Sequence, residues 1–262
     1  MALEFDRASV DYASSTSRVG ISGYPFSIAA WVNVVDITVG FQGICSQGNF
    51  SVNRSGFWFH ATSGDAIETL RLSLNDGTSS SDIDGTGKLT AGVWQHACCV
   101  ATSSDVSFYI NGAFDSSPAH SSTWLESTTH DFYIACENDG SNSPNSGTVL
   151  DGSIAELAIY DRALTAAEVA SLGLGFYPPM VAQDGLLRYW SLRSEPPTEL
   201  ELIGGMDVTV TGATSIDHPR IIYPGAQILQ FPGSSMTITD IDTDFTWDDG
   251  DQGLVIAGTG FV

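Results

Sequence analysis

The stretch "LDGSIAELAIYDRALTAAEVASL", residues Leu150–Leu172, decides the fold. An Asp-Gly turn at Asp151 precedes an apolar run that predicts a β-strand. Thr165 then stands three residues before Glu168, the spacing of a capping box, and predicts the start of a short helix. Because Asp151 and Glu156 are both acidic and lie within the strand segment, the stretch also raises the question of an acid pair in a hydrolase.

The same two-residue period recurs along the chain and predicts further strands. In "LRLSLNDG", Leu70, Leu72 and Leu74 alternate with polar residues and end at an Asp-Gly turn. In "VSFYINGAF", Asn111-Gly112 is a strong hairpin signal, because a type I′ turn needs positive φ at both central residues. Short strands at this density, separated by clusters of Gly, Ser, Asn and Asp, predict an all-β fold: a two-sheet antiparallel β-sandwich or jelly roll with one short helix.

Charge excludes several classes of partner. The chain has 262 residues, of which 31 are acidic and nine basic, and its formal net charge is −22. Coulomb repulsion therefore opposes binding to nucleic acid or to an anionic membrane. No apolar run is long enough to span a bilayer, and "MALEFDRASVDY" lacks the basic and apolar regions of a signal peptide. We therefore expect synthesis in the cytoplasm without export, and four reduced, mostly buried cysteines.

Several of these motifs together resemble a known superfamily. They are "PFSIAAWVNV", "GVWQHACCVATSSDVSFYINGA" and "LDGSIAELAIYDRALTAAEVASL", preceded by "ALEFDRASVDY". In this order, over residues 1–175, they resemble the laminin-G-like, concanavalin A-like lectin/glucanase superfamily. The resemblance implies two stacked antiparallel sheets with jelly-roll topology.

The remaining chain divides into two parts by composition. Residues 176–222 begin with the linker-like "FYPPMVAQDG" and predict short strands, which either complete the first sandwich or start a second, small β unit. Length favours the first arrangement, because fewer than 90 residues remain after 175. Residues 223–262 are predicted to form a β-rich C-terminal extension suited to docking on a neighbour.

The acids do not follow the pattern of a glucanase. The resemblance implies that an enzyme of this superfamily would carry two or three acids at alternate positions of one strand, yet no E-x-D-x-E run occurs. Asp151 and Glu156 are five residues apart, so a regular strand would place them on opposite faces. We expect Asp151 to serve in a turn and Glu156 to bind a backbone amide or Arg162. No catalytic residue is therefore predicted, and the protein is expected not to be an enzyme.

Calcium and carbohydrate remain as candidate ligands. The resemblance implies calcium at loop ends, and the hard oxygen ligands Asp82, Asp84, Glu137 and Asp139 are the candidates. Trp31 and Trp58 are the candidate platforms for stacking on a sugar ring, with burial in the core as the alternative for both. His96 is expected to be a packed, hydrogen-bonded residue rather than a ligand. No other cofactor is expected.

These observations lead to a structural role at a virus surface. The superfamily usually works outside cells, whereas this chain lacks an export signal, and phage structural proteins meet both conditions because they are released by lysis. We therefore expect a non-enzymatic virion surface protein, most simply a phage capsid decoration (cement) protein that contacts the major capsid protein and forms a homo-oligomer such as a trimer. The alternative is a carbohydrate-binding module of a phage tail or host-attachment protein.

Overall fold

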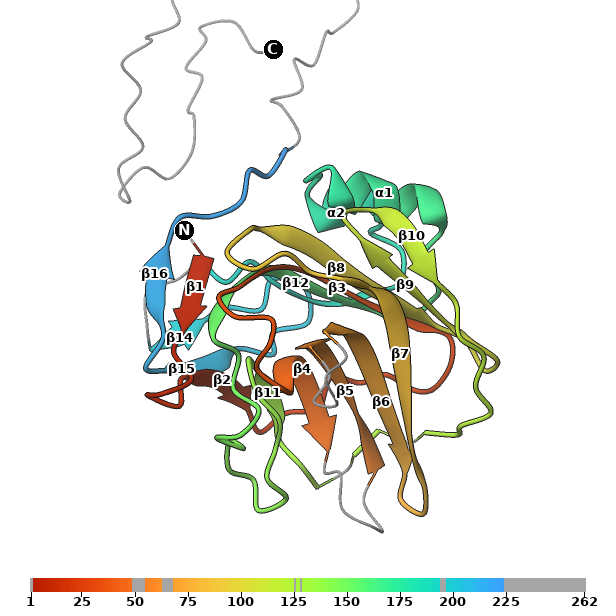
Figure 1. Cartoon of the computed structure of the whole chain (residues 1–262), viewed down its shortest axis with the longest axis horizontal. Helices are drawn as coiled ribbons and strands as arrows, with labels where there is room; N and C mark the ends of the chain where they lie inside the picture. The colour runs from red at the N-terminus through yellow and green to blue at the C-terminus, as the bar shows by residue number, and fades with distance from the viewer. Residues whose placement is uncertain are drawn as a thin grey trace, which may run out of the picture. The chain divides into compact units, whose positions relative to one another are not determined.

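Alternating apolar residues build two antiparallel sheets that stack face to face, as Figure 1 shows. The computed structural model describes residues 2–48, 55–62, 68–124, 126–127, 129–193 and 197–223. The chain divides into two units, Met1–Pro224 and Gly225–Val262. Apart from Tyr223, the β extension predicted for residues 223–262 lies outside the described residues.

The first sheet, called sheet A, follows the order β10-β9-β8-β3-β12-β1-β16, with β13 also paired to β12. Its strands are β1 (Ala2–Phe5), β3 (Phe26–Val34), β8 (Gln95–Ala101), β9 (Val106–Ile110), β10 (Ala113–Ser116), β12 (Gly152–Tyr160), β13 (Leu186–Trp190) and β16 (Thr214–Ile216). All their pairings are antiparallel.

The second sheet, called sheet B, follows the order β14-β15-β2-β11-β4-β5-β6-β7. Its strands are β2 (Tyr12–Ser15), β4 (Gln42–Gly48), β5 (Ser55–Thr62), β6 (Thr69–Asp76), β7 (Ser80–Lys88), β11 (Phe132–Ile134), β14 (Thr198–Glu199) and β15 (Val208–Thr211). Two antiparallel sheets in this arrangement confirm the predicted all-β sandwich.

The core between the sheets follows the period-two pattern of the sequence. Leu70, Leu72 and Leu74 all point into it from β6, as predicted, and Phe57 and Phe59 do so from β5. Residues between them point to the outer face of sheet B. Each buried Leu or Phe contributes roughly 1.5–3 kcal/mol by leaving water, so this alternation determines which face of sheet B is exposed.

The predicted helix forms, and a second, shorter one follows it. Helix α1 (Ala166–Gly173) begins at Thr165, whose hydroxyl accepts from the Glu168 backbone N–H, while the Glu168 carboxylate accepts from the Thr165 N–H. The single turn α2 (Pro178–Val181) was not predicted; proline occupies its first position, where no N–H is required. Helix α1 packs so closely on the β9–β10 turn that a Cβ at Gly112 would lie 2.9 Å from the Ala170 Cα.

The chain after Gly175 contributes strands to both sheets. β13 pairs with β12 and β16 pairs with β1 in sheet A, while β15 pairs with β2 in sheet B and carries the short β14 at the sheet edge. Trp190 of β13 is fully buried and stacks on Phe132 of β11, with ring centroids 5.1 Å apart. Its indole N–H donates to the Met206 carbonyl at 2.9 Å. The described residues of 176–222 therefore add strands to both sheets and side chains such as Trp190 and Val208 to the core.

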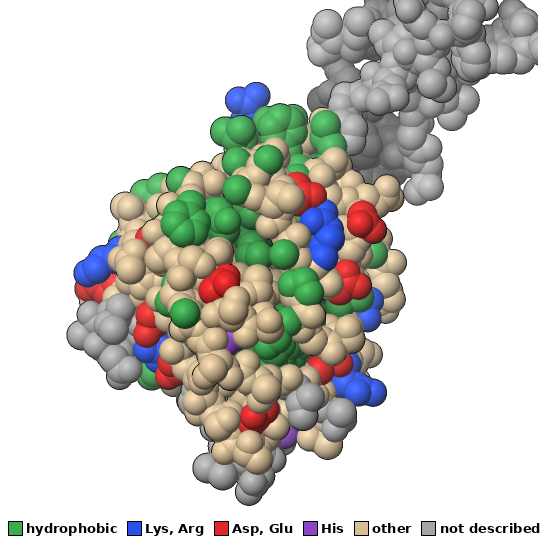
Figure 2. All heavy atoms as spheres, turned by 90° about the vertical axis from the view of Figure 1, so that its right-hand side faces the viewer, with side chains coloured by type: hydrophobic (Ala, Val, Ile, Leu, Met, Phe, Trp, Pro, Cys, Tyr) green, Lys and Arg blue, Asp and Glu red, His purple; other side chains and the backbone are tan. Residues whose placement is uncertain are grey.

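The surface of the described unit carries several exposed apolar side chains. In Figure 2, hydrophobic side chains gather in the upper part of the folded unit, the end at which Figure 1 places α1, α2 and β10. Phe114, Leu174 and Met180 are 60%, 71% and 49% exposed. In contrast, all four cysteines are buried, and none forms a disulfide, as predicted. Among the described residues, no helix has the length and apolar character needed to cross a bilayer.

Candidate functional site: the outer face of sheet B

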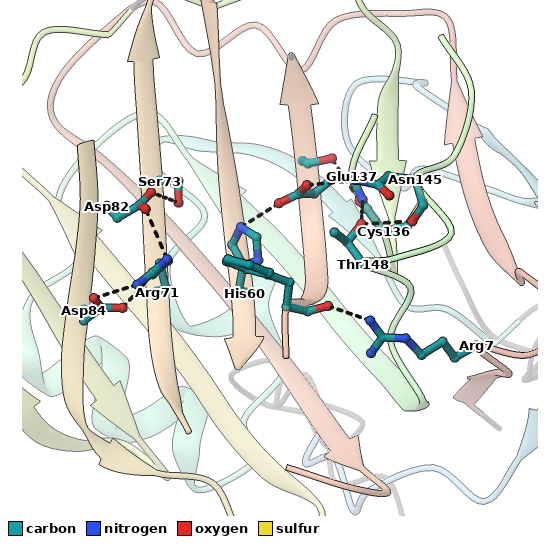
Figure 3. Close-up of polar contacts among 12 residues, drawn as sticks. Arg7, His60, Arg71, Ser73, Asp82, Asp84, Cys136, Glu137, Asn145 and Thr148 are labelled. Carbon is teal, nitrogen blue, oxygen red and sulfur yellow. Dashed lines mark hydrogen bonds and ion pairs between the residues drawn. The ribbon is translucent and has the colours of Figure 1, made fainter. Parts of the chain in front are cut away.

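Polar side chains from neighbouring strands form a row across the outer face of sheet B. Figure 3 shows Asp84 of β7, Arg71 of β6 and His60 of β5 side by side, followed by Glu137, which lies just after β11. The register explains the row, because Arg71 pairs with Asp84 on one side and with His60 on the other. We call the residues Phe41, His60, Arg71, Asp82, Asp84 and Glu137 the outer-face cluster.

Two aspartates hold the guanidinium of Arg71. Its Nε and Nη2 donate to the two carboxylate oxygens of Asp84 at 2.7 and 3.0 Å, and its Nη1 donates to Asp82 Oδ2 at 3.1 Å. Ser73 Oγ donates to the other oxygen of Asp82 at 2.7 Å. Arg71 is only 3% exposed, whereas the side chains of Asp82 and Asp84 are 37% and 26% exposed. The two carboxylates, rather than the cation, are therefore the charged groups that meet solvent here.

His60 and Glu137 form a second, more deeply buried contact, with Nε2 and Oε1 3.1 Å apart. Burial, with the nearby charge of Arg71, lowers the pKa of His60 to about 3. Burial raises the pKa of Glu137 to about 7, against the lowering effect of its hydrogen bond from Asn145. At neutral pH the contact therefore joins a neutral imidazole to a carboxyl group that is close to its own titration point, and is not a full ion pair.

Phe41 supplies the aromatic ring of this face. The ring is partly buried, and its centroid lies 5.9 Å from that of the His60 ring. The guanidinium carbon of Arg71 lies 5.7 Å from the centroid of the Phe41 ring. The backbone of Phe41 has φ +37°, a left-handed conformation that is a genuine outlier for a bulky residue. Such strain costs of order 1–3 kcal/mol and tends to gather at binding sites. Nothing in the sequence pattern singles out Phe41. Strand alternation, in contrast, puts Arg71, Asp82 and Asp84 on the outer face, because the core takes their neighbours Leu70, Leu72 and Ile83.

The two predicted stacking tryptophans lie on different sheets. Trp58 is on the outer face of β5, next to the cluster, but its side chain is fully buried. Trp31 is half-buried on the outer face of sheet A, where its ring meets that of His96 edge-on at 5.7 Å. His96 is 2% exposed, and burial lowers its pKa to about 3. It is packed against Trp31, as predicted, but its Nδ1 has no hydrogen-bond partner among the described residues.

The candidate calcium ligands are brought only partly together. Asp82 and Asp84 both bind Arg71, and Glu137 contacts His60. Asp139 instead accepts the backbone N–H groups of Ser141 and Ser143 within its own loop. In the part of the chain that the structure describes, no three His, Cys, Asp or Glu side chains are placed to hold one metal ion. Calcium binding by these residues stays a prediction.

Asp151 and Glu156 do not act together, although the reason differs from strand parity. A β-bulge between Ala155 and Ala158 interrupts the pairing of β12 with β3, and Glu156 within it has φ +55°. The regular alternation of side chains between the two faces of a strand is therefore broken between Asp151 and Glu156. Asp151 lies in the turn before β12, whereas Glu156 is buried in a network of its own, with no hydrogen-bond partner in common with Asp151 among the described residues.

The carboxylate of Glu156 binds neither Arg162 nor, among the described residues, a backbone amide, so both predicted alternatives were wrong. Its carboxylate accepts from the Tyr189 hydroxyl at 2.5 Å and from Arg193 Nη2 at 2.7 Å, and lies 3.0 Å from His218 Nε2. Arg162 pairs with Glu168 of α1 instead, at 2.6 Å. The partners of Glu156 come from residues 176–222, more than 30 positions along the chain, and no local pattern indicates them.

Two stacked antiparallel sheets, one bearing a polar outer face with a partly exposed aromatic ring, define a lectin-like β-sandwich. The family model of the Concanavalin A-like lectin/glucanases superfamily (Laminin_G_3) matches residues 7–170, and the chain belongs to this superfamily. The chain matches none of the curated proteins.

Many solved structures are similar in fold, and two of them illustrate the likeness. One is a Bacteroides ovatus protein with a proposed carbohydrate-binding role: the TM-score is 0.61 and the identity 19%, over 84% of this chain and 61% of the other. The second is the CBM40 of the Ruminococcus gnavus IT-sialidase, with a TM-score of 0.50 and 12% identity, over 66% of this chain and 96% of the other. The chain thus spans about three fifths of the Bacteroides protein, and identities this low show the fold alone.

The His60–Glu137 contact leads to a prediction about pH. The pKa of Glu137 is about 7 in the folded state and 4.5 in the unfolded chain. Between these pH values the folded state binds the proton more tightly, so Glu137 increases the free energy of unfolding as the pH falls from 7 to 4.5. His60 acts oppositely, since the unfolded chain binds its proton near 6.5 and the folded state only near 3. Glu137→Gln removes the first effect, so this variant should lose about 2 kcal/mol more than the wild type between pH 6.5 and 4.5.

Urea unfolding at a series of pH values measures this difference. Glu68→Gln is the matched control, because Glu68 pairs with the exposed Lys88 at the end of the same sheet. The control should keep the wild-type pH dependence. If the stability of Glu137→Gln and that of the wild type depend on pH in the same way, the raised pKa of Glu137 is contradicted.

Proposed function

We propose that this protein is a non-enzymatic, lectin-like binding module and that the outer-face cluster of sheet B binds a glycan. The observation that carries the proposal is the partly exposed ring of Phe41, which is held in a strained conformation next to the His60 ring and the Arg71 guanidinium. The same guanidinium binds the carboxylates of Asp82 and Asp84. A sugar ring stacks its apolar face on an aromatic side chain while fixed polar groups take up its hydroxyls. The similarity in fold to a protein with a proposed carbohydrate-binding role is consistent with this proposal.

The geometry of the acids supports a binding role rather than hydrolysis. Glycoside hydrolysis usually needs one protonated and one ionised carboxyl group flanking the same bond. Asp82 and Asp84 both face the positive charge of Arg71, and the side chains of His60 and Arg71 stand between them and Glu137. We propose on these grounds that the face holds a glycan without cleaving it.

A glycan array with the wild type and Phe41→Ala tests the proposal. Loss of the stacking ring should weaken binding of any retained glycan about tenfold or more, since base–aromatic and sugar–aromatic contacts of this kind contribute on the order of 1–3 kcal/mol. Phe114→Ala is the matched control, because Phe114 is an exposed ring on β10 of the other sheet. Absence of any glycan signal, or turnover of a bound glycan that Glu137→Gln abolishes, would contradict the proposal.

A second candidate places the module on a virion, as a capsid decoration protein or an attachment protein. The observation that favours it is an exposed apolar turn beside β14, which ends sheet B in the described residues. Leu200, Leu202 and Ile203 are 55%, 50% and 46% exposed there. An apolar patch next to a sheet edge is suited to packing against another protein, such as a major capsid protein or a second copy of the chain.

Purified particles test this second candidate. We expect the protein to co-sediment with virions in a fixed ratio, and Leu202→Asp to release it, whereas Leu174→Asp on α1 should not. Absence of the protein from particles would reject the virion role and leave the glycan-binding proposal standing.

A further inference from the structure

We infer that the outer-face cluster selects neutral glycans and rejects anionic ones, an inference that rests on the proposed function. Anionic sugars, such as sialic and uronic acids, require a cationic group with free N–H donors. Among the described residues the cluster offers none, because Arg71 is bound by two carboxylates. Beyond the cluster, backbone carbonyls hold Arg7, and Lys88, exposed at the end of β7, is paired with Glu68.

Arg71 is engaged by carboxylates. All three of its guanidinium nitrogens donate to Asp82 or Asp84, at 2.7–3.1 Å, and the residue is 3% exposed. An approaching carboxylate would meet the exposed oxygens of Asp82 and Asp84 before it met the cation. Since two carboxylates surround one guanidinium, the local charge of this group is −1, and it repels an anion.

Arg7, at the other end of the row in Figure 3, is engaged by backbone carbonyls. Its Nη2 donates to the carbonyls of Gly40 and Phe41 at 3.1 and 3.3 Å and also to that of Gly147. Its Nη1 is buried. His60 adds no positive charge at neutral pH, since burial and the charge of Arg71 keep its imidazole neutral. The net charge of −22 over the whole chain further disfavours approach of an anion.

A neutral sugar meets a different surface. Its hydroxyls are donors, and the exposed oxygens of Asp82 and Asp84 are acceptors held in place by Arg71 and Ser73. Because Arg71 fixes both carboxylates, they lose little side-chain freedom on binding. The same ion pair that blocks an anion therefore prepares the face for a neutral ligand.

Matched pairs of immobilised glycans test the inference: lactose with 3′-sialyllactose, and galactotetraose with tetragalacturonic acid. The wild type should bind the neutral member of a pair at least tenfold more tightly. Asp84→Asn removes one of the two negative charges beside Arg71. It should reduce the difference in affinity between neutral and anionic glycans about tenfold, because the anionic glycan then binds more tightly. Asp161→Asn, an equal change of charge at an exposed site after β12 of sheet A, should leave it unchanged.

The outcomes separate this inference from the proposed function. Equal binding of both members by the wild type would overturn the charge selectivity while glycan binding stands. No signal for any glycan would overturn both. If circular dichroism shows that Asp84→Asn is unfolded, Asp82→Asn repeats the test. A folded variant that gains no affinity for the anionic glycan would also overturn the inference.

Discussion

Trp190→Ala is expected to lower the free energy of unfolding by about 3–5 kcal/mol, the range for truncating a buried tryptophan. The side chain is fully buried between the sheets and stacks on Phe132 of sheet B, although Trp190 itself belongs to β13 of sheet A. Alanine would leave a large cavity and remove the indole donor from the Met206 carbonyl. The loss should therefore affect both sheets.

Urea unfolding followed by circular dichroism measures this loss. Trp31→Ala is the matched control, since the same residue type is only half-buried on the outer face of sheet A, and a loss below about 2 kcal/mol is expected there. Similar losses in the two variants would contradict a core that includes residues after 175. So would a separate unfolding transition for residues 176–222.

Glu156→Ala is expected to cost about 3–5 kcal/mol as well, the range for removing one partner of a buried ion pair. The carboxylate is 1% exposed and receives hydrogen bonds from Tyr189 and Arg193, with His218 at 3.0 Å. Without it, the buried Tyr189 hydroxyl and the Arg193 guanidinium, whose side chain is 32% exposed, lose their acceptor. Glu156→Gln should cost less, because the amide oxygen still accepts from Tyr189.

Urea unfolding and hydrogen exchange measure the effect of Glu156→Ala on the fold. The loss in urea unfolding should exceed that of Glu68→Ala, a partly exposed pair with Lys88 expected to contribute at most about 1 kcal/mol. Hydrogen exchange should accelerate first in residues 176–223, since Arg193 and His218 tie that part of the chain to β12. A cost for Glu156→Ala within 1 kcal/mol of the control would show that the network adds little.

Much of the fold could be predicted because its causes are local. The alternation of Leu70, Leu72 and Leu74 determines which face of β6 is buried, and Thr165 with Glu168 satisfies the free N–H groups at the start of α1. Asn111 and Gly112 both have positive φ, as a type I′ turn requires. Each of these features depends on neighbours within a few residues.

The candidate site was predictable only in part. Asp82, Asp84 and Glu137 were singled out as oxygen donors, and they lie on one face, but as partners of Arg71 and His60. Trp31 and Trp58 were the candidate stacking rings, with burial as the alternative for both. Trp58 is buried, whereas the partly exposed ring in this cluster is that of Phe41. Exposure depends on what packs over a side chain, and the strand pattern does not contain that information.

The sequence by itself therefore determined the strands, the turn residues, the helix cap and the burial of alternate apolar side chains, because these follow from backbone preference and from the period of a strand. Only the tertiary structure decided how Glu156 is used. The bulge in β12 turns its side chain away from the position that parity assigns, and the chain returning after Gly175 supplies Tyr189, Arg193 and His218. Partners more than 30 residues apart meet only when the sheets are assembled.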